Sequence, residues 1–492
     1  MSTQHLEQEI KDLIKEDNEV NPIKEKVINL MLQNDKEEAT EELVKNIKQR
    51  NKLYTTRDDD KSEIWIYKDG IYEPQGKTHI KEYSRGILGK GYKPYLASQI
   101  IAKIEADTYI DQEEFFNNIL KDEICVNNGI LNLKTRKLTP WDSNKIFFTK
   151  SPVEYDPIAV CPNIEKHFKT VLKDASDSET MFELFGFALY KDYFIEKAIM
   201  FNGGGRNGKG KTLLLLKNFL GHGNYSSIPL QQFDTDVYSA EELLNKMANI
   251  AGDLSSKSLN QTGMFKMLTG RDNISASRKF KSRVNFVNFA KLIFACNDLP
   301  KTKDTSLAFW NRWITFDFPY TFLGEDEINE LKDSERANVK LRDPAIIDKI
   351  SSPEELSGLL NKALDGLQRL FTHKDFSKTK GIQDIKDFWI RRSDSFLAFC
   401  LDCVEIDDDT KIEKKVLRNA YFDYCKKYKV KKKENDKTIK ETLYNEYAVY
   451  EDRQDDRHFW SGVKLKETKG YETIEDLTGK YSQKKNGDVT NE

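Results

Sequence analysis

The sequence predicts an α/β fold built around a phosphate-binding loop, because a strand-like run, a glycine-rich loop and a helical run follow one another directly. "AIMF" at 198–201 is typical of a buried strand, and "TLLLLKNFLG" at 212–221 predicts a helix that ends at a glycine. Further apolar runs at 247–251 and 292–296, and "WITFDF" after them, predict more strands of the same sheet.

The glycine-rich stretch "NGGGRNGKGK" lies between this strand and this helix. Backbone N–H groups of such a loop and of the helix N-terminus surround phosphates, and one lysine neutralises charge on the β and γ positions. Strand, glycines, lysine and helix in this order indicate that the chain binds a nucleoside triphosphate.

Two lysines compete for the phosphate-binding position. The pattern G-x-x-x-x-G-K-[ST] fits from Gly205 to Lys211 with Thr212 as the hydroxyl, whereas an earlier frame from Gly203 to Lys209 has a glycine in place of the hydroxyl. We favour Lys209, because the first glycine of a phosphate loop follows its strand almost directly. Thr212 lies two positions past that glycine, about 200° round the helix axis, so it cannot readily replace the missing hydroxyl. The predicted nucleotide-binding residues are Gly203, Gly204, Gly205, Arg206, Asn207, Gly208, Lys209, Gly210, Lys211 and Thr212.

Three polar residues beside the later strands are candidates for catalysis together with Lys209. Asp253 follows the apolar run 247–251 and is the predicted ligand of Mg²⁺. Asn297 ends the next strand and could position the attacking water, although an asparagine that opens a turn would look the same. Arg312 precedes "WITFDF" and could stabilise phosphoryl transfer from a neighbouring subunit, or form an ordinary ion pair.

A basic segment lies between Asp253 and Asn297. "KMLTGRDNISASRKFKSRVNFVNF" alternates apolar and polar residues as a β-hairpin does, and it is rich in lysine and arginine. Such a hairpin can contact the phosphates of single-stranded DNA without reading its sequence. The predicted DNA-binding residues are Lys266, Arg278, Lys279 and Lys281.

Flanking regions extend this core on both sides. Residues 5–50 show helical periodicity, and Asp69-Gly70 and Asn127-Asn128-Gly129 predict two hairpin turns. Residues 411–440 hold twelve Lys or Arg and four Asp or Glu, which suits either phosphate binding or a solvated helical face. We expect a helical N-terminal segment at 1–60, an α/β module at 61–162, the ATPase core at 163–375, a winged-helix-like DNA-binding domain at 376–475 and a disordered tail at 476–492.

Composition restricts the class of protein. Hydrophobic residues make up 38% and charged residues 32% of the 492, which is typical of a globular protein with much exposed helix. No apolar run approaches the roughly 20 residues that span a bilayer, and the charged N-terminus lacks a signal-peptide core, so we expect a cytoplasmic protein without a membrane partner. Six cysteines form no disulfide framework, and we read Cys400 and Cys403 as small helical residues and assign no zinc site.

Taken in order, "GGGRNGKGK", "NIAGDLSSKSL", "FKMLTGRDNISASRKFK", "AKLIFACNDLPKTKDTS" and "FWNRWITFDFP" resemble the superfamily 3 helicase domain of the phage and plasmid primase-helicase family, which is related to the poxvirus-type primase-helicases. "VNNGILNLKTRKLTPW" is similar to the module that precedes this domain, and "SDSFLAFCLDCVEI" opens a stretch similar to its winged-helix region. The resemblance covers about 80–460, with five motifs in register.

The resemblance implies an AAA+-type ring, a homo-hexamer that hydrolyses ATP with Mg²⁺ between subunits and moves 3′ to 5′ on single-stranded or forked DNA. Within the family pattern, Lys209 matches the phosphate-loop lysine, Asp253 the acidic strand end, Asn297 the sensor and Arg312 the arginine finger. Lys279 matches the hairpin residue that faces DNA. The family is one of phage, plasmid or integrated elements, so the implied role is replication inside a host cell.

The sequence departs from the family pattern in three places. Gly210 stands where the family often has Ser or Thr, Asp253 lacks a second acidic neighbour, which leaves the general base unassigned, and the paired arginine reads Asn311-Arg312. The roughly 60 helical residues before the family module are too few for a polymerase domain, so we expect a separate primase or polymerase as partner. Two other functions remain open: an ATP-dependent origin-binding or loading factor that does not unwind DNA processively, and a degenerate ATPase.

Overall fold

The computed structural model describes residues 22–58, 61–174, 176–255, 257–279, 282–377, 380–428, 430, 433–454 and 456–466. They fall into two compact units. The first is formed by the described residues of Met1–Leu254, Gln261–Ala295 and Arg312–Thr379, and the second by those of Ser255–Asn260, Cys296–Asn311 and Lys380–Glu492.

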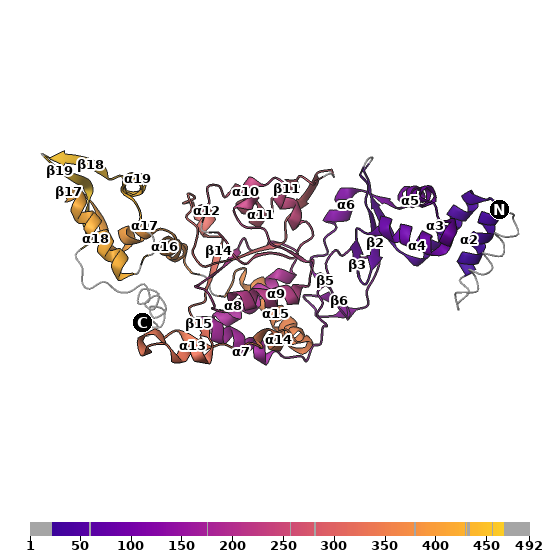
Figure 1. Ribbon diagram of the computed structural model, residues 1–492, viewed down its shortest axis with the longest axis horizontal. Coiled ribbons are helices and arrows are strands. Elements are labelled where there is room, and N and C mark those ends of the chain that lie inside the picture. The colour runs from indigo at the N-terminus through magenta and orange to yellow at the C-terminus, as the bar shows by residue number, and fades with distance from the viewer. Residues whose placement is uncertain are drawn as a thin grey trace. The chain divides into compact units, whose positions relative to one another are not determined.

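The first unit begins with helices that pack beside a four-stranded sheet of order β3-β2-β1-β4 (Figure 1). The helices are α2 (Pro22–Leu32), α3 (Lys36–Arg50), α4 (Gly76–Leu88), η1 (Gly89–Gly91), α5 (Pro94–Thr108) and α6 (Gln112–Asn117), and the strands are β1 (Leu53–Thr56), β2 (Ile64–Lys68), β3 (Ile71–Glu73) and β4 (Tyr109–Ile110). Val27, Leu43 and Ile47 are buried in this part, which confirms the helical periodicity expected there. The apolar residues before position 22 lie outside the described residues.

Both predicted hairpin turns are confirmed. β2 and β3 pair antiparallel around Asp69 and Gly70, whose φ angles of 48° and 96° match the type I′ turn that suits a tight hairpin. The second hairpin forms a sheet of order β5-β6-β7, with β5 (Glu123–Val126), β6 (Gly129–Asn132) and β7 (Leu138–Thr139). Gly129 has a φ of 152°, and a Cβ there would lie 2.4 Å from the carbonyl oxygen of Thr139.

A five-stranded sheet of order β14-β8-β13-β10-β9 forms the centre of the first unit. Its strands are β8 (Ala198–Asn202), β9 (Tyr225–Ser226), β10 (Ala248–Ala251), β13 (Lys291–Cys296) and β14 (Trp313–Asp317). β14 pairs with β8, β13 with β10 and β10 with β9, each in parallel. Every residue of β8, β10 and β13 is buried, as expected where both faces of a parallel sheet are covered. Counted along the chain, the order is 5-1-4-3-2, and helices cover the sheet, so the predicted α/β fold class is confirmed.

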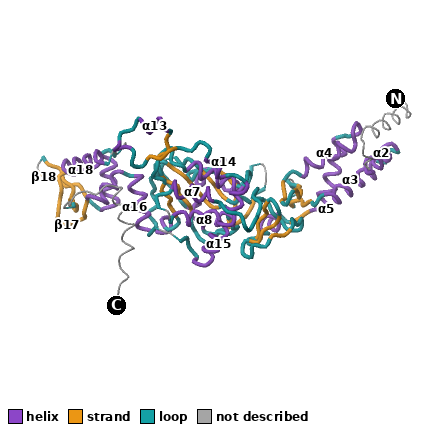
Figure 2. Tube along the Cα trace, turned by 90° about the horizontal axis from the view of Figure 1, so that it is seen from below, coloured by secondary structure: helices purple, strands orange, loops and turns teal. Residues whose placement is uncertain are grey.

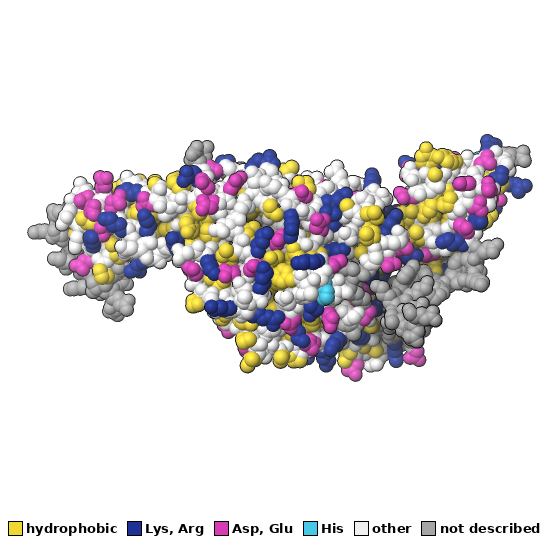
Figure 3. All heavy atoms as spheres, turned by 180° about the vertical axis from the view of Figure 1, so that it is seen from behind, with side chains coloured by type: hydrophobic (Ala, Val, Ile, Leu, Met, Phe, Trp, Pro, Cys, Tyr) yellow, Lys and Arg dark blue, Asp and Glu magenta, His cyan; other side chains and the backbone are white. Residues whose placement is uncertain are grey.

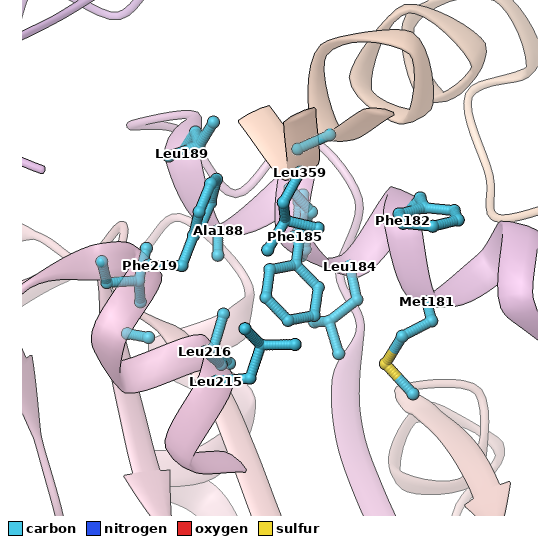
Figure 4. Packing of buried hydrophobic residues seen from close by; sticks show 14 of the residues in the cluster. Met181, Phe182, Leu184, Phe185, Ala188, Leu189, Leu215, Leu216, Phe219 and Leu359 are labelled. Carbon is cyan, nitrogen blue, oxygen red and sulfur yellow. The ribbon is translucent and has the colours of Figure 1, made fainter. Parts of the chain in front are cut away.

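Helices around this sheet bury the largest hydrophobic cluster of the unit. They are α7 (Pro162–Val171), α8 (Asp177–Leu189), α9 (Lys209–Leu220), α14 (Ile346–Ile350) and α15 (Pro353–His373). Figure 4 shows Phe185 of α8 between α9 and α15, beside Leu216 and Leu359, and its ring centroid lies 5.5 Å from that of Phe219. α8 and α15 pack along their length, near α7 (Figure 2).

Several short elements complete the first unit. Between β9 and β13 along the chain, in addition to β10, the elements are α10 (Gln232–Thr235), η2 (Ser239–Leu243), α11 (Gly263–Thr269), β11 (Asn273–Ala276) and β12 (Val284–Val287). β11 and β12 form the antiparallel hairpin that the sequence predicts. After β14 come β15 (Thr321–Leu323), α13 (Glu325–Asn329), η3 (Asp333–Glu335) and β16 (Val339–Leu341), with β15 and β16 paired in parallel.

The second unit contains a winged-helix arrangement. Its elements are α12 (Leu307–Trp310), α16 (Ile382–Ser393), α17 (Ser395–Cys403), β17 (Val404–Glu413), α18 (Lys414–Lys427), α19 (Asp436–Tyr447), β18 (Tyr450–Gln454) and β19 (Arg457–Leu465). From α17 onward the order is helix, strand, two helices and two strands, and the sheet order is β17-β19-β18. This topology confirms the winged-helix-like C-terminal fold. Cys400 and Cys403 are buried on α17.

The segment between β13 and β14 belongs to this second unit. Lys301 forms ion pairs with Asp394 at 2.6 Å and Glu434 at 2.9 Å, and the indole of Trp389 donates to the carbonyl of Pro300 at 2.7 Å. The predicted domain boundaries stay a prediction, and the predicted disordered tail lies outside the described residues. None of the helices in the described ranges has the length and hydropathy that a membrane-spanning segment needs.

The close packing of α8 on α15 yields a stability prediction. A Cβ on Gly186 would lie 2.2 Å from the carbonyl oxygen of Ala363, so we expect Gly186→Ala to force the helices apart and destabilise the protein by about 1–3 kcal/mol. Gly86 is the matched control, because it is an exposed glycine of α4 with nothing within 4 Å of its Cβ position. Thermal unfolding should show a lower Tm for Gly186→Ala and an unchanged or higher Tm for Gly86→Ala; equal Tm values would contradict the packing.

Candidate active site

The loop after β8 is shaped by the two glycines at its ends. Gly203 has a φ of 154°, and a Cβ there would lie 2.4 Å from the carbonyl oxygen of Phe318. Gly208 precedes α9 with a φ of 91°, and a Cβ there would lie 2.7 Å from Cγ1 of Val171. Gly204 and Gly205, by contrast, are exposed and have nothing within 4 Å. The ends of the loop therefore require glycine, while its middle is open to a ligand.

Lys209 is the first residue of α9, and its side chain reaches back over the loop. Its ammonium donates to the carbonyl oxygen of Gly203 and, at 3.2 Å, to that of Gly204. Its backbone N–H donates to Oδ1 of Asn207 at 3.3 Å, and the amide of Asn207 donates to the carbonyl oxygen of Phe318 at 3.2 Å. An ammonium held there can neutralise phosphates bound by the N–H groups of the same loop.

Lys211 and Thr212 have different surroundings from Lys209. Lys211 is exposed on the first turn of α9. Thr212 is 1% exposed, donates to the carbonyl oxygen of Gly208 at 3.2 Å and lies 3.0 Å from Nε2 of His167. Burial lowers the pKa of His167 to about 4, so this imidazole is neutral at pH 7. This geometry favours the frame that ends at Lys209, because the hydroxyl of the other frame is buried and already hydrogen-bonded within the protein.

Arg206 lies at the tip of the loop in a left-handed conformation with a φ of 59°. The positive φ angles of Arg206 and Gly208 bend the loop tightly before α9, and turns of this kind can present backbone N–H groups to an anion. The guanidinium of Arg206 forms a two-bonded ion pair with Glu327 of α13, at 2.6 and 2.8 Å. The hydrogen bonds from Arg206 and from the backbone N–H of Gly324 lower the pKa of Glu327 to about 2.

The residues present fit a nucleoside triphosphate. The glycine-rich loop before the N-terminus of α9, the close approach at Gly203 and the ammonium of Lys209 match what phosphate oxygens require. For Mg²⁺, the predicted ligand Asp253 is exposed two residues after β10, and the neighbouring Gly252 lies beside Leu213 of α9. In the described ranges, no group of three His, Cys, Asp or Glu side chains could hold a metal ion. One carboxylate suits Mg²⁺, which usually keeps waters and phosphate oxygens as its other ligands.

Two further polar residues, which the sequence patterns did not indicate, lie beside the loop. Asp317 ends β14 and accepts from the amide of Asn202 at 3.5 Å, directly before Gly203. Glu327 reaches the loop from α13. Neither belongs to a recognisable motif, and the signal that could have found Asp317 is its place at the end of the strand that pairs with β8. Asn297 directly follows β13, is exposed and belongs to the second unit.

Arg312 lies at the opposite end of the β14–β8 pair from the loop. Its carbonyl oxygen accepts from the N–H of Ala198 at 2.6 Å, where β8 begins. Its guanidinium donates to Thr269 Oγ1 at 2.9 Å and to Glu196 at 2.8 Å. The five residues of β8 separate this position from the loop by about 15 Å. Arg312 is thus not brought together with Lys209 within one chain.

The basic residues of the hairpin region have unlike environments. Lys279, near the hairpin tip, is exposed, and Lys266 on α11 is half-buried. The side chain of Arg278 is 5% exposed and forms ion pairs with Glu63 at 2.7 Å and Glu241 at 3.3 Å. The prediction that Arg278 faces DNA does not fit this position, because two carboxylates of the same chain already surround its guanidinium. Lys281 lies outside the described residues. Basic and acidic side chains are interspersed over the face seen in Figure 3.

Comparison with known proteins finds related families over much of the chain. Residues 4–177 match a family described as D5 N terminal like, and residues 201–312 match a family of unknown function (DUF5906). The putative helicase V13 of Sputnik virophage is 22% identical over 438 residues, which cover 82% of this chain and 55% of V13. The putative helicase L207/L206 of Acanthamoeba polyphaga mimivirus is 27% identical over 173 residues, which cover 34% of this chain and 18% of that protein. The chain thus spans about half the length of V13.

Solved structures show weaker likenesses. The A form apo structure of the NrS-1 C terminal region is 14% identical, with a TM-score of 0.43, over 85% of this chain and 98% of that one. A JCV helicase bound to a thiazolopyridine acetamide is 13% identical, with a TM-score of 0.22, over 46% of this chain and 59% of that one.

The burial of Thr212 gives a prediction that separates the two loop frames. Thr212→Val removes the hydroxyl that lies between His167 and the carbonyl of Gly208. We expect a loss of stability of about 1–3 kcal/mol, because a buried imidazole nitrogen loses its hydrogen-bond partner. The Mg²⁺ dependence of nucleotide binding should change little, because Thr212 is not the Mg²⁺-binding hydroxyl in the frame that ends at Lys209. Thr212→Ser is the matched control and should restore stability. Loss of Mg²⁺-dependent nucleotide binding in a stable Thr212→Val protein would instead favour the frame with Lys211.

Proposed function

We propose that this chain, which belongs to the phage and viral primase-helicase family, is the ATP-driven motor of a replicative DNA helicase. In this proposal, subunits form a ring, hydrolyse ATP with Mg²⁺ between neighbours and move along single-stranded DNA. The observation that carries the proposal is the division of charged groups between the two ends of one strand pair. Lys209 lies over the phosphate loop at one end of β8, and Arg312 lies at the other.

The loop end supports the nucleotide-binding half of the proposal. Phosphates would be bound by N–H groups of the loop before Lys209, and the ammonium of Lys209 would neutralise their charge as the bond to the γ-phosphate breaks. Asp253 is the residue that would hold Mg²⁺, which supplies positive charge to the phosphate oxygens. The exposed Asn297, directly after β13, is a candidate to orient the attacking water.

The other end supports a ring. Since β8 puts about 15 Å between Arg312 and the loop of the same subunit, Arg312 would serve only the nucleotide of a neighbour. The side chain already has a defined direction, because Thr269 and Glu196 accept its hydrogen bonds. A guanidinium supplied in this way contributes roughly 10³ to 10⁵ to the rate of phosphoryl transfer in other systems.

For DNA, the exposed Lys279 beside the tip of the β11–β12 hairpin is the candidate to contact phosphates of the strand in the ring. The winged-helix region favours a second function, an origin-binding or loading factor. The last turn of α18 carries Lys426 and Lys427, within the stretch 411–440 that has an excess of basic residues. Strand displacement on forked DNA separates the two. ATP hydrolysis stimulated by single strands without unwinding, at every protein concentration, would favour the loading factor.

The phosphate-loop assignment gives a direct test on two lysines of the same turn. We expect Lys209→Ala to lower ATP hydrolysis by about 10²-fold or more and Lys211→Ala to lower it only a few-fold, because only Lys209 reaches over the loop. ATP turnover and nucleotide affinity of both variants, with circular dichroism to confirm folding, would measure this. The reverse order of effects would overturn the assignment, and an inactive wild type that still binds ATP would indicate a degenerate ATPase.

The trans role of Arg312 predicts complementation between two inactive variants. We expect Arg312→Ala and Lys209→Ala to be inactive alone and to regain activity when mixed, because about a quarter of randomly formed interfaces would combine an intact lysine with an intact arginine. Arg336→Ala is the control, since Arg336 is another partly exposed arginine with a carboxylate partner, Asp333. A mixture as inactive as its components, in rings verified by mass measurement, would show that Arg312 does not act across subunits.

A further inference from the structure

The phosphate loop has a carboxylate partner that none of the sequence motifs contains, Glu327 of α13. We infer that Glu327 lowers the affinity of this site for nucleotide, because its carboxylate and the terminal phosphate of a bound nucleoside triphosphate compete for the guanidinium of Arg206. The inference rests on the proposed function, in that it requires the loop to bind a nucleoside triphosphate.

The geometry of the pair is that of a phosphate contact. Both terminal nitrogens of Arg206 donate, one to each oxygen of Glu327, at 2.6 and 2.8 Å. This parallel, two-bonded arrangement is the one that a guanidinium makes equally well with a carboxylate or with a phosphate. Arg206 lies at the tip of the loop, three residues before Lys209, so the group that it binds lies next to the phosphate position.

Contacts independent of the ion pair keep Glu327 close to the loop. The backbone N–H of Phe322 donates to the carbonyl oxygen of Arg206 at 2.8 Å, and the ring of Phe322 lies beside Gly208. At the other end of the same segment, Lys340 donates to the carbonyl oxygen of Thr170, in the last turn of α7, at 2.7 Å. Release of Arg206 therefore needs only a side-chain rotation, and the carboxylate remains a neighbour of the loop in both states.

The pair is weak enough to be displaced. The side chains of Arg206 and Glu327 are 49% and 43% exposed, and ion pairs in contact with water contribute little. A triphosphate with Mg²⁺, held at the same time by the loop N–H groups and by Lys209, presents more partners to Arg206 than a single carboxylate does. Glu327 stays ionised throughout the neutral range, because its hydrogen bonds with Arg206 and Gly324 hold its pKa at about 2.

A positioning role is the opposing explanation. If Glu327 instead held Arg206 in the orientation that binds phosphate, its removal would weaken nucleotide binding. Competition predicts the reverse sign, since without the carboxylate the guanidinium is available before the nucleotide arrives. The sign of the effect therefore distinguishes the two roles.

Glu327→Gln is the appropriate variant, because the amide oxygen can still accept the hydrogen bond that the N–H of Gly324 donates at 2.9 Å. Asp365→Asn is the matched control, since Asp365 forms a similarly exposed ion pair with Arg136 at 2.5 Å on a different part of the first unit. Equilibrium binding of ATP and of ADP to the full chain, with Mg²⁺, should be measured for wild type, both variants, Arg206→Ala and the double variant Arg206→Ala/Glu327→Gln.

We expect Glu327→Gln to lower the Kd for ATP about two- to fivefold, and that for ADP less, with no change for Asp365→Asn. In the Arg206→Ala background the gain should shrink, because no guanidinium is left to release. Unchanged or weaker ATP binding by Glu327→Gln would overturn the inference, as would a gain that persists in full without Arg206, which would indicate simple charge repulsion. Both results leave the proposed function standing. It fails, and the inference with it, if wild type and Lys209→Ala bind ATP equally poorly.

Discussion

The pairing of β14 with β8 is the constraint on which both ends of the candidate site depend. Its register matches Trp313 with Ala198 and Asp317 with Asn202, so the two strands begin and end together. At the carboxyl end the N–H of Phe318 continues the ladder to the carbonyl of Asn202, and the backbone of Phe318 comes so close to Gly203 that a side chain could not fit. At the amino end the same ladder fixes the backbone of the residue before β14, which is Arg312. A shift by one residue would turn every buried side chain of β14 to the other face of the sheet.

Local sequence patterns predicted the elements that depend on neighbouring residues in the chain. The strand, loop and helix from 198 to 220 and the turn at Asp69-Gly70 formed as expected, because glycine requirements and apolar periodicity are properties of a short window. Side-chain partners from distant segments were not predictable in this way. The burial of Arg278 depends on Glu63, 215 residues earlier, and the buried hydrogen bond of Thr212 depends on His167, 45 residues earlier.

The amino end of the sheet is organised by a buried lysine. Lys291 begins β13, is fully buried and donates to the carbonyl oxygens of Tyr190 and Phe289 at 2.7 Å and of Asp192 at 3.2 Å. Burial lowers the pKa of this group to about 7, and the three carbonyl acceptors satisfy the hydrogen bonds of its nitrogen. The result is a fixed backbone between α8 and β8. The carboxylate of Asp192, on that backbone, then accepts from Arg271 at 2.9 Å, one residue past Gly270.

The two ends of the sheet therefore differ in how they are held. The loop end consists of glycines and backbone N–H groups, and its charged groups, Arg206 and Lys209, have partners that a phosphate can replace. The amino end has buried hydrogen bonds at Lys291 and a guanidinium at Arg312 that is already directed by Thr269 and Glu196. A group that serves a neighbouring subunit has to keep its direction before that neighbour arrives, because disorder at the interface would reduce its effect on the transition state. A group that binds its own ligand can instead change partners. The distribution of rigid and exchangeable contacts along β8 is therefore the one that the proposed ring would require.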